Sequence, residues 1–369
     1  MGLRIVVDLD GVICQLKRPF ESYADVEPKM DTIRLMKEWR KQGHYIIIHS
    51  ARHMKTCKGD VSEVVRRVGD ETTNWLKKWE VPYDEIFFGK PYGDIYIDDL
   101  AIQFSSAKQV GQKVDASRPI IVMPMAGLGK RFAQAGYDKP KFAICAKGKT
   151  FLEWSLASLP LEIADRVVFV CLKQHEKDFS VTKFITKIMG NEYPAVRFEV
   201  VLIDNPTRGQ AETVLKAKNK IDPEKALVIF NIDSHFLASR LKQQLMAAQF
   251  QGIDGIIGVF NDKRPLWSFA EVDRSGFVTR TAEKEPISNL ACTGLYIFSK
   301  GSEFFKAAEA AINSNSLTKN EFYIAPLYNS LIKEGKKIVV DFADEFWCLG
   351  TPEQLEEFNK KYVAKHDRA

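Results

Sequence analysis

The sequence predicts an α/β protein that contains two doubly wound domains, each built on a parallel sheet. With 369 residues, the chain is long enough to bury more than one hydrophobic core. Short apolar segments alternate with helix-like segments in both halves, and this alternation favours parallel sheets. A polar stretch without strong periodicity lies between Phe104 and Pro119. We therefore expect one domain over residues 1–115, then a linker, and a second domain over residues 118–369.

The composition is that of an ordinary globular protein. Hydrophobic residues make up 45% and charged residues 27%, which excludes a disordered or fibrous chain. The net charge of +5 is modest and no basic run is interleaved with aromatic residues, so we expect anionic substrates and no nucleic acid. The six cysteines show no CxxC spacing, and no apolar run approaches the roughly 20 residues that span a bilayer. We expect a cytoplasmic protein without a membrane partner.

In the first half, apolar strands are each followed by polar residues. The expected strands cover residues 4–9, 45–48 and 95–97, and the expected helices cover residues 30–41 and 61–79. Asp8 and Asp10 end the first strand, and Ser50 follows the second. Asp98 and Asp99 follow the third. Because ligands bind at the carboxyl ends of parallel strands, we expect these side chains to meet at one point. Helix capping by the first two aspartates and a turn role for the serine are the alternatives.

Together with Lys90, which lies in the segment FGKP, these residues suit phosphoryl transfer. Asp8 would attack as the nucleophile and form an aspartyl-phosphate, while Asp10 would serve as general acid and then as general base. Ser50 and Lys90 would hold the phosphoryl oxygens. The carboxylates expected to bind Mg²⁺ are Asp8, Asp10, Asp98 and Asp99.

The first half resembles the haloacid dehalogenase (HAD) superfamily. Within it, the runs HSARHMKTCKGDV and WLKKWEVPYDEIFFGKPYGDIYIDDLAI are similar to small phosphatases encoded with bacterial capsule biosynthesis genes. The resemblance implies a HAD-like Rossmannoid domain that hydrolyses phosphate monoesters. The short inserts between its motifs leave room for little or no cap. Arg52, beside this site, is expected either to bind a second anionic group of the substrate or to pair with a surface acid.

The second half opens on a phosphate-binding pattern. The apolar strand Ile120–Met125 leads into the turn Ala126-Gly127-Leu128-Gly129-Lys130, whose glycines let backbone N–H groups approach an anion. Arg131 and Lys141 supply two cations for a triphosphate. An ordinary glycine turn beside surface cations is the alternative. In this order, the residues resemble the signature of nucleotidyltransferases that make nucleotide-activated sugars, which implies a GT-A-like fold.

The rest of the second half continues to alternate expected strands and helices. Further strands are expected over residues 167–172, 198–203 and 226–229, and helices over residues 151–159 and 181–189. The resemblance implies that Gln210 contacts the nucleobase, unless its segment is only a helix cap, and that Asp233 binds Mg²⁺. It also implies that Glu283, Lys284 and Gly294 line the acceptor site, with the lysine clamping the acceptor phosphate. A solvated charge run is the alternative for the first two of these.

Cys348 departs from the family pattern. Many relatives carry a second metal-binding aspartate at this place, and a buried thiol is a poor ligand for Mg²⁺. Either Asp233 and the nucleotide phosphates hold the metal alone, or Asp344 or Glu345 substitutes, or this half has lost activity.

The sequence therefore predicts a bifunctional enzyme of surface polysaccharide precursor synthesis. In the second half, a sugar- or polyol-phosphate attacks the α-phosphorus of a nucleoside triphosphate, and pyrophosphate leaves. A resemblance to cytidylyltransferases makes CTP the first guess. The first half hydrolyses a phosphate monoester, and both sites use Mg²⁺. The alternative is that one half alone is active and the other is a regulatory or nucleotide-binding module. A sugar transferase would need a DxD motif, and Asp233 stands alone. A homo-oligomer is left open.

Overall fold

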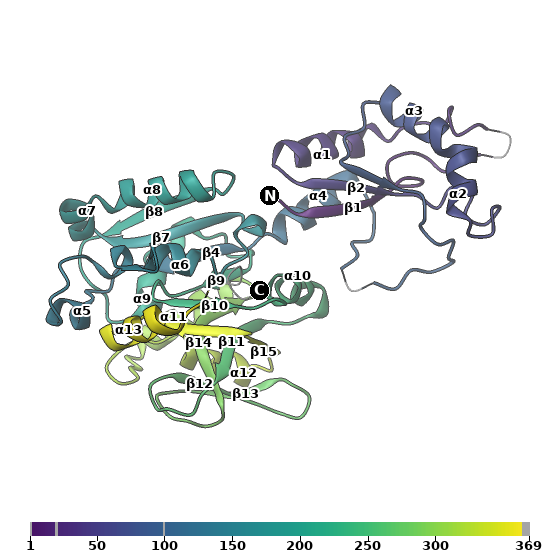
Figure 1. Cartoon of the computed structure of the whole chain (residues 1–369). Helices are drawn as coiled ribbons and strands as arrows, with labels where there is room; N and C mark the ends of the chain where they lie inside the picture. Colours follow the sequence, from purple (N-terminus) through teal and green to yellow (C-terminus); the bar gives the residue numbers. More distant parts are fainter. Residues whose placement is uncertain (1, 19–20, 99, 364–369) are drawn as a thin grey trace. The chain divides into compact units, whose positions relative to one another are not determined.

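The chain folds into two compact units, which are described separately. The computed structural model describes residues 2–18, 21–98 and 100–363 (Figure 1). The first unit spans Met1–Asp115 and the second spans Ala116–Ala369. The linker expected before Pro119 is instead largely the helix α4 (Ala107–Ala116). The buried residues of α4 are Gly111 and Val114. Gly111 packs closely on Leu35, since a Cβ on it would lie 2.9 Å from the leucine Cδ1. A helix with so few buried residues looks merely polar in sequence.

Three parallel strands form the sheet of the first unit, in the order β1-β2-β3. They are β1 (Arg4–Asp8), β2 (Tyr45–His49) and β3 (Glu85–Phe87). Asp8 pairs with His49, and His49 pairs with Phe87, so the carboxyl ends of the three strands are level. The segments that follow the strands therefore start from one edge of the sheet, where ligands bind in open α/β folds.

Three helices accompany this sheet. They are α1 (Met30–Lys41), α2 (Val61–Val64) and α3 (Asp70–Lys78). A π-helical turn, Val65–Gly69, joins α2 to α3, so the single helix expected over residues 61–79 is interrupted. Trp75 of α3 is buried and donates its Nε1–H to the carbonyl of Val26 over 2.8 Å. This bond ties α3 to the connection between β1 and α1.

The strand expected over residues 95–97 does not form. Ile95 is 81% exposed and Ile97 is 98% exposed, so the apolar side chains that suggested a strand have no core to pack against. Within the described residues, β1 is paired only with β2, and the sheet winds in one direction from it. The prediction of a doubly wound first domain is therefore not met by the strands described. An alternating pattern specifies a strand only when one face is buried.

The second unit is built on a nine-stranded mixed sheet, with β13-β12-β14-β9-β4-β7-β8 as its main path. Its strands are β4 (Ile120–Pro124), β7 (Arg166–Leu172), β8 (Phe198–Ile203), β9 (Leu227–Ile229), β11 (Gly255–Asn261), β12 (Ser268–Val272), β13 (Val278–Glu283), β14 (Leu290–Phe298) and β15 (Ile338–Phe342). Two short pairs lie outside it, β5 (Cys145–Ala146) with β6 (Lys149–Thr150) and β10 (Ser234–Leu237) with β16 (Glu345–Cys348).

The parallel strands β9, β4, β7 and β8 confirm the predicted alternation in this unit. The strands β4, β7 and β9 are apolar runs with mostly buried side chains, which is typical of strands covered on both faces, whereas β8 at the edge of the sheet buries only Ile203. The sheet is not parallel throughout, however. β14 runs antiparallel to β9, β11 and β12, β12 and β13 form a hairpin, and β15 runs parallel to β11.

Helices accompany the sheet of the second unit. They are α5 (Lys130–Gln134), α6 (Phe151–Leu156), α7 (Lys173–Phe179), α8 (Val181–Glu192), α9 (Gln210–Leu215), α10 (Leu241–Gln251), α11 (Gly301–Asn313), α12 (Tyr328–Lys333) and α13 (Pro352–Lys361). A capping box starts α6, because Thr150 accepts from the backbone of Glu153 and Glu153 accepts from the backbone of Thr150. In the part of the chain that the structure describes, no helix combines the length and apolar character needed to cross a membrane.

Candidate functional site

The glycine turn after β4 leaves open space beside the backbone. Met125 and Ala126 are buried, whereas Gly127 is exposed and a Cβ there would meet no atom within 4 Å. Gly129 has φ +61, in the left-handed region, and a Cβ on it would lie 3.6 Å from Lys141 Cβ. Both glycines therefore let a ligand approach the main chain, as a phosphate-binding turn requires. Leu128 beside them is exposed.

Lys141 and Asp233 form an ion pair next to this turn. The lysine starts a short 3₁₀ turn, and its Nζ contacts Asp233 Oδ2. The two side chains are 21% and 22% exposed, so solvent reaches both. Asp233 directly precedes β10, and its carbonyl accepts from the N–H of Leu349 over 2.7 Å. The structure thus brings the predicted phosphate cation and the predicted metal ligand together.

Cys348 lies beside the same carboxylate. Ser234 of β10 pairs with Cys348 of β16, and a Cβ on Gly350 would lie 3.2 Å from Cys348 Sγ and 3.5 Å from Asp233 Oδ2. Burial raises the pKa of the Cys348 thiol to about 12, with a further rise from the negative charge of Asp233. The thiol is therefore neutral at physiological pH and offers Mg²⁺ no charged ligand.

Neither predicted substitute for the missing aspartate adjoins Asp233. Glu345 pairs with Leu237 at the far end of the short ladder, and its Oε1 accepts from Trp347 Nε1 over 2.6 Å. Asp344 accepts from the backbone of Ser239 over 2.7 Å. Across residues 2–18, 21–98 and 100–363, no group of three His, Cys, Asp or Glu side chains could hold a metal ion. This geometry does not support Asp344 or Glu345 as the substitute, which leaves the other two alternatives, a metal held by Asp233 together with ligand phosphates or a loss of activity in this half.

Gln210 reaches Asn231 across the same edge of the sheet. Gln210 is the first residue of α9, and its Nε2 donates to Asn231 Oδ1. Gly294 of β14 has φ +90, and a Cβ there would lie 2.3 Å from Asn231 Nδ2. The predicted base contact and the predicted acceptor-site glycine therefore both adjoin Asn231. Sequence reasoning missed this residue, although its place two residues before Asp233 was a signal.

Glu283 and Lys284 are not a solvated charge run. Glu283 is 7% exposed, accepts a hydrogen bond from Ser268 Oγ, and has its pKa raised by burial. Lys284 adopts φ +55 and donates from Nζ to the Tyr323 hydroxyl over 3.0 Å. This hydrogen bond is the main cause of its raised pKa. The tyrosine orients the lysine, and the buried glutamate faces the unit's interior.

In the first unit, Asp8, Ser50 and Lys90 lie together at the carboxyl edge of the sheet. Lys90 Nζ contacts Asp8 Oδ2 over 2.7 Å, and the Lys90 N–H donates to the Ser50 carbonyl over 3.2 Å. Ser50 is fully buried. Burial and the nearby Lys90 charge lower the pKa of His49, so a neutral imidazole stands beside this pair. These residues lie together because the strands that precede them end at the same level of the sheet, which is the reason given in the sequence-based prediction.

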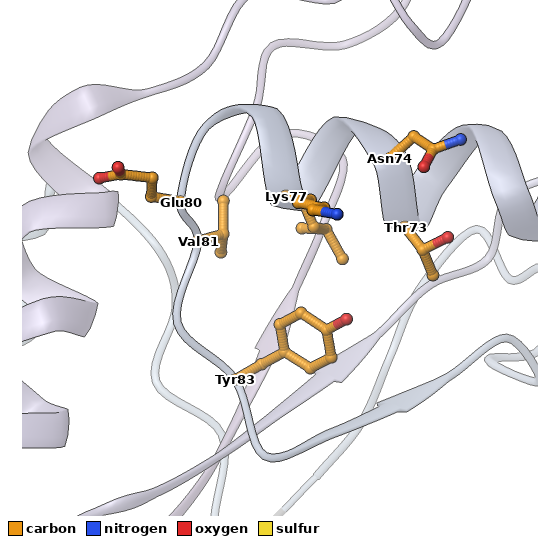
Figure 2. Close-up of a pocket in the computed structure, with 7 residues that line it drawn as sticks. Thr73, Asn74, Lys77, Glu80, Val81 and Tyr83 are labelled. Carbon is orange, nitrogen blue, oxygen red and sulfur yellow. The ribbon is translucent and has the colours of Figure 1, made fainter.

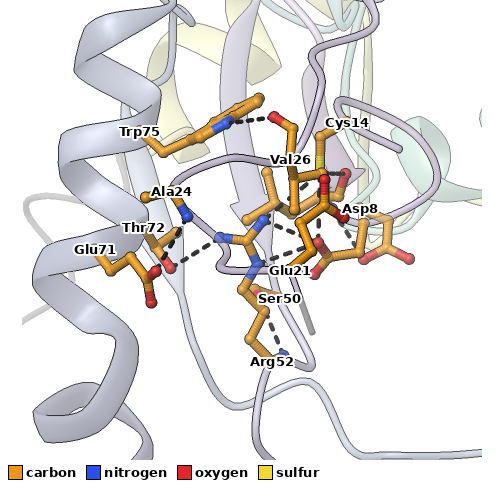
Figure 3. A network of polar contacts seen from close by, with 12 residues as sticks. Asp8, Cys14, Glu21, Ala24, Val26, Ser50, Arg52, Glu71, Thr72 and Trp75 are labelled. Atoms are coloured by element: carbon orange, nitrogen blue, oxygen red, sulfur yellow. Dashed lines mark hydrogen bonds and ion pairs between the residues drawn. The ribbon is translucent and has the colours of Figure 1, made fainter. Parts of the chain in front are cut away.

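Arg52 is neither a surface pair nor free to meet a substrate, which corrects both predictions for it. Its side chain is 0% exposed, and Asp10 accepts from Nε over 3.0 Å and from a terminal nitrogen over 2.9 Å (Figure 3). The other terminal nitrogen donates to Thr72 Oγ1 over 3.1 Å, and the guanidinium lies 4.2 Å from the centre of the Tyr23 ring. A buried guanidinium needs such partners. Arg52 therefore holds Asp10 in place.

The structure does not bring Asp98 to the other carboxylates of the first unit. Among the described residues no metal-holding group contains Asp8, Asp10 and Asp98, because the segment before Asp98 is not part of the sheet. Asp98 is exposed, and its Oδ1 accepts from the N–H of Leu100 over 2.7 Å. Asp99 lies outside the described residues.

A hollow of about 530 Å³ lies elsewhere in the first unit, beside the end of α3 (Figure 2). It is lined by Thr73, Asn74, Leu76, Lys77, Glu80, Val81 and Tyr83. No predicted site residue lines it, and Lys77 and Glu80 are exposed. The hollow is therefore separate from the candidate site.

Comparisons with known proteins concern mainly the second unit. Residues 120–365 match the profile of the family described as nucleotidyl transferase. A nucleoside-diphosphate-sugar pyrophosphorylase from Vibrio cholerae RC9 is 31% identical, with a TM-score of 0.56 over 65% of this chain and 100% of its own. An apo UDP-glucose pyrophosphorylase structure is 18% identical, with a TM-score of 0.54 over 66% of this chain and 98% of its own. No curated protein sequence matches the chain.

Proposed function

Because this chain belongs to the nucleotidyl transferase family, we propose that its second unit transfers a nucleotidyl group to a phosphorylated sugar or polyol. The proposal rests mainly on the proximity of three features of the second unit. An open glycine turn, Lys141 and Asp233 lie together at the carboxyl edge of the parallel strands. The pyrophosphorylase from Vibrio cholerae RC9, which this chain matches over 100% of its length at 31% identity, supports the proposal.

In the proposed reaction, an oxygen of the acceptor phosphate attacks the α-phosphorus of a nucleoside triphosphate in line. The bond from that phosphorus to the bridging oxygen breaks, and pyrophosphate leaves with the electron pair. Lys141 and Arg131 would neutralise the triphosphate, and Lys284 would hold the acceptor phosphate. Asp233 would hold Mg²⁺, which when bound withdraws charge from the α-phosphate. The Asp233 carboxylate is a hard ligand that suits Mg²⁺, and the neutral thiol of Cys348 would leave coordination positions of the ion available to phosphate oxygens.

We take CTP as the first nucleotide to test, and precursors of surface polysaccharide as the setting. The decisive experiment measures pyrophosphate release with the four ribonucleotides and dTTP against a panel of sugar and polyol phosphates. Release with at least one pair is expected. Protein that binds a nucleotide but releases pyrophosphate with no acceptor would be a nucleotide sensor, the alternative in which one half alone is active. The six free cysteines favour a reducing compartment, in line with a cytoplasmic enzyme.

For the first unit, we propose hydrolysis of a phosphate monoester through an aspartyl-phosphate on Asp8. The contact between Asp8 and Lys90, and the fixed Asp10 beside it, support the proposal. Asp10 would protonate the leaving oxygen and then activate water. Ser50 and Lys90 would hold the phosphoryl oxygens.

This second reaction has a structural requirement. We propose that residues 95–97 add to the edge of β1 that is unpaired within the described residues, which would bring Asp98 towards the other carboxylates. The test is phosphate release from a panel of phosphate monoesters with and without Mg²⁺, followed by hydrogen exchange of residues 95–97. Activity with these amides unprotected under all conditions would contradict the assignment of Asp98 and Asp99 to the metal.

A further inference from the structure

The two carboxylate oxygens of Asp10 are held unequally. Oδ1 accepts from Arg52 Nη2 over 2.9 Å, from Arg52 Nε over 3.1 Å and from the Cys14 thiol over 3.3 Å. Oδ2 accepts from Arg52 Nε over 3.0 Å and forms no other hydrogen bond within the described residues. The oxygens of a carboxylate are chemically alike, so their places in this network distinguish them. Because the Asp10 side chain is 23% exposed, Oδ2 is the oxygen that a ligand can use.

Arg52 can impose this orientation because its own guanidinium is fixed. Its side chain is 0% exposed, and its Nη1 donates to Oγ1 of the buried Thr72 over 3.1 Å. The centre of the Tyr23 ring lies 4.2 Å from the guanidinium carbon. The backbone N–H of Arg52 donates to Ser50 Oγ over 3.2 Å, which ties the residue to the segment after β2. A guanidinium is buried at a cost unless such partners are in place, so it has little freedom to turn.

Helix α3, which carries the threonine, also fastens the loop that carries Tyr23 (Figure 3). Glu71 Oε1 accepts from the N–H of Ala24 over 3.0 Å. Trp75 Nε1 donates to the carbonyl of Val26 over 2.8 Å. Both contacts lie within three residues of the ring that covers the guanidinium. One helix therefore holds the guanidinium and its cover.

The reaction proposed for the first unit makes a specific demand on Asp10. When the bond from phosphorus to the ester oxygen breaks, the electron pair stays on that oxygen, and an alcohol forms only if a proton reaches it. The acid must therefore keep one oxygen directed at the ester oxygen while Asp8 attacks phosphorus in line. A carboxylate oxygen offers about two acceptor positions. Oδ1 of Asp10 already accepts from three donor groups, so the proton belongs on Oδ2.

We propose that Arg52 and Thr72 are positioning residues that direct Oδ2 of Asp10 to the leaving oxygen, which suits the first unit to phosphate esters of unactivated alcohols. The proposal rests on the phosphate hydrolysis proposed above and narrows its substrate class. Neither residue touches the substrate, and both act through Asp10. In the second step, water attacks phosphorus and its proton passes to Oδ2. The bond to Asp8 then breaks with its electron pair on that carboxylate, and the acid is restored.

The test compares two esters of similar size that differ in their need for a proton. Benzyl phosphate releases an alcohol, whereas 4-nitrophenyl phosphate releases a phenolate that is stable without a proton. The value of kcat/KM, measured with Mg²⁺ present, reports the steps up to loss of the alcohol, so later hydrolysis of the aspartyl-phosphate does not enter. The full-length variants are Arg52→Lys, Thr72→Val and Asp10→Asn. Arg34→Lys, on the exposed surface of α1, is the matched control and should change neither value.

Arg52→Lys keeps the charge but loses the fork that binds Asp10. We expect kcat/KM for benzyl phosphate to fall about ten- to a hundredfold, and that for 4-nitrophenyl phosphate to fall less than about threefold. Thr72→Val, which keeps the volume but not the hydrogen bond, should give a selective fall of about three- to tenfold. The ratio of the two values within one protein cancels any loss of folded material.

An unchanged ratio in folded Arg52→Lys or in folded Thr72→Val would overturn the proposal, because a merely structural role lowers both values equally. Failure of the hydrolysis itself would look different. The natural protein would then release phosphate from neither ester, or Asp10→Asn would lower both values by the same factor, and the positioning role would fall with the reaction.

Discussion

The two units each place a carboxylate beside a cation, but they hold it in different ways. In the first unit, the buried Arg52 binds Asp10 through two nitrogen atoms and is itself held by Thr72. In the second unit, Lys141 contacts Asp233 through a single Nζ, and solvent reaches both side chains. A guanidinium fork fixes the orientation of a carboxylate, whereas an ammonium on a flexible stem changes partners easily. Asp10 is therefore fixed before any ligand binds, and Asp233 is held by a partner that phosphate can replace.

The contrast between the two units requires that their sites act separately. The substitution Asp8→Asn tests this and should produce the largest change in a reaction rate. We expect phosphate release to fall by at least about ten-thousandfold, because an amide cannot serve as the nucleophile. Pyrophosphate release should stay within about twofold of the natural protein, since the substitution alters no group of the second site. Asp115→Asn, at an exposed position of the same unit, is the control and should change neither reaction.

Lys141→Ala is the reverse experiment. Loss of a charge that stabilises the transition state should lower pyrophosphate release by about a hundred- to a thousandfold. Phosphate release should be unchanged. Lys139→Ala removes a lysine from the same loop at an exposed position and should have little effect on either rate. If Lys141→Ala abolished both reactions in folded protein, the sites would be coupled and the comparison of separate sites would be wrong.

Paired substitutions sharpen the contrast between a fixed and an exchangeable cation. Arg52→Met should destabilise the first unit by about 3 kcal/mol, because it leaves Asp10 partly buried without its charge partner. Lys141→Met should cost the second unit about 1 kcal/mol or less, since that pair is open to solvent. Calorimetry of the full chain measures both shifts. Equal losses of unfolding free energy would show that the two pairs do not differ in the way we describe.

Asp341 provides a further test, because it is a carboxyl group of the second unit that is buried in the fold and does not belong to the proposed site. Burial outweighs the attraction of Arg240 and raises the pKa of Asp341 from 3.8 to about 6, and its Oδ1 has no hydrogen-bond partner. Since the folded state holds the proton more tightly, this stabilisation is complete below pH 3.8 and is lost as pH rises to about 6.

The loss should amount to about 3 kcal/mol of unfolding free energy between those limits, because one pKa unit corresponds to about 1.4 kcal/mol. The measurement is urea unfolding as a function of pH, with Asp341→Asn as the variant that cannot ionise. The variant should remove this part of the pH dependence. A natural protein and a variant with parallel profiles over that range would contradict the assignment.

Much of the second unit followed from the sequence, because its parallel strands are apolar runs that alternate with helix-like segments. On its antiparallel side, residues 267–273 and 278–288 resemble the family's acceptor-side hairpin and form β12 and β13, whereas β11 and β15 were not predicted. The cluster of Gly129, Lys141 and Asp233 was predicted by the order of its residues. Asn231 was missed because its amide carries no charge, although it stands two residues before Asp233.

The first unit shows which features of a site cannot be predicted from the sequence. Strand ends that are level brought Asp8, Ser50 and Lys90 together as expected. The burial of Arg52 was not visible in sequence, because its partner Thr72 lies on a distant helix and burial depends on the packing of the Tyr23 ring. The prediction of a strand over residues 95–97 was wrong for the described structure. An apolar pattern forms a strand only where a neighbouring strand and a buried face are available, and the sequence does not show whether they are.

The pairing of β10 with β16 also has a consequence for synthesis of the protein. Asp233 emerges from the ribosome more than a hundred residues before Cys348 and Gly350, which complete its surroundings. A nascent chain can build the parallel strands early, since domains fold as they emerge, but its nucleotide pocket stays unfinished until the late strand arrives. Ribosomes stalled before residue 345 would therefore carry chains that do not retain a nucleotide.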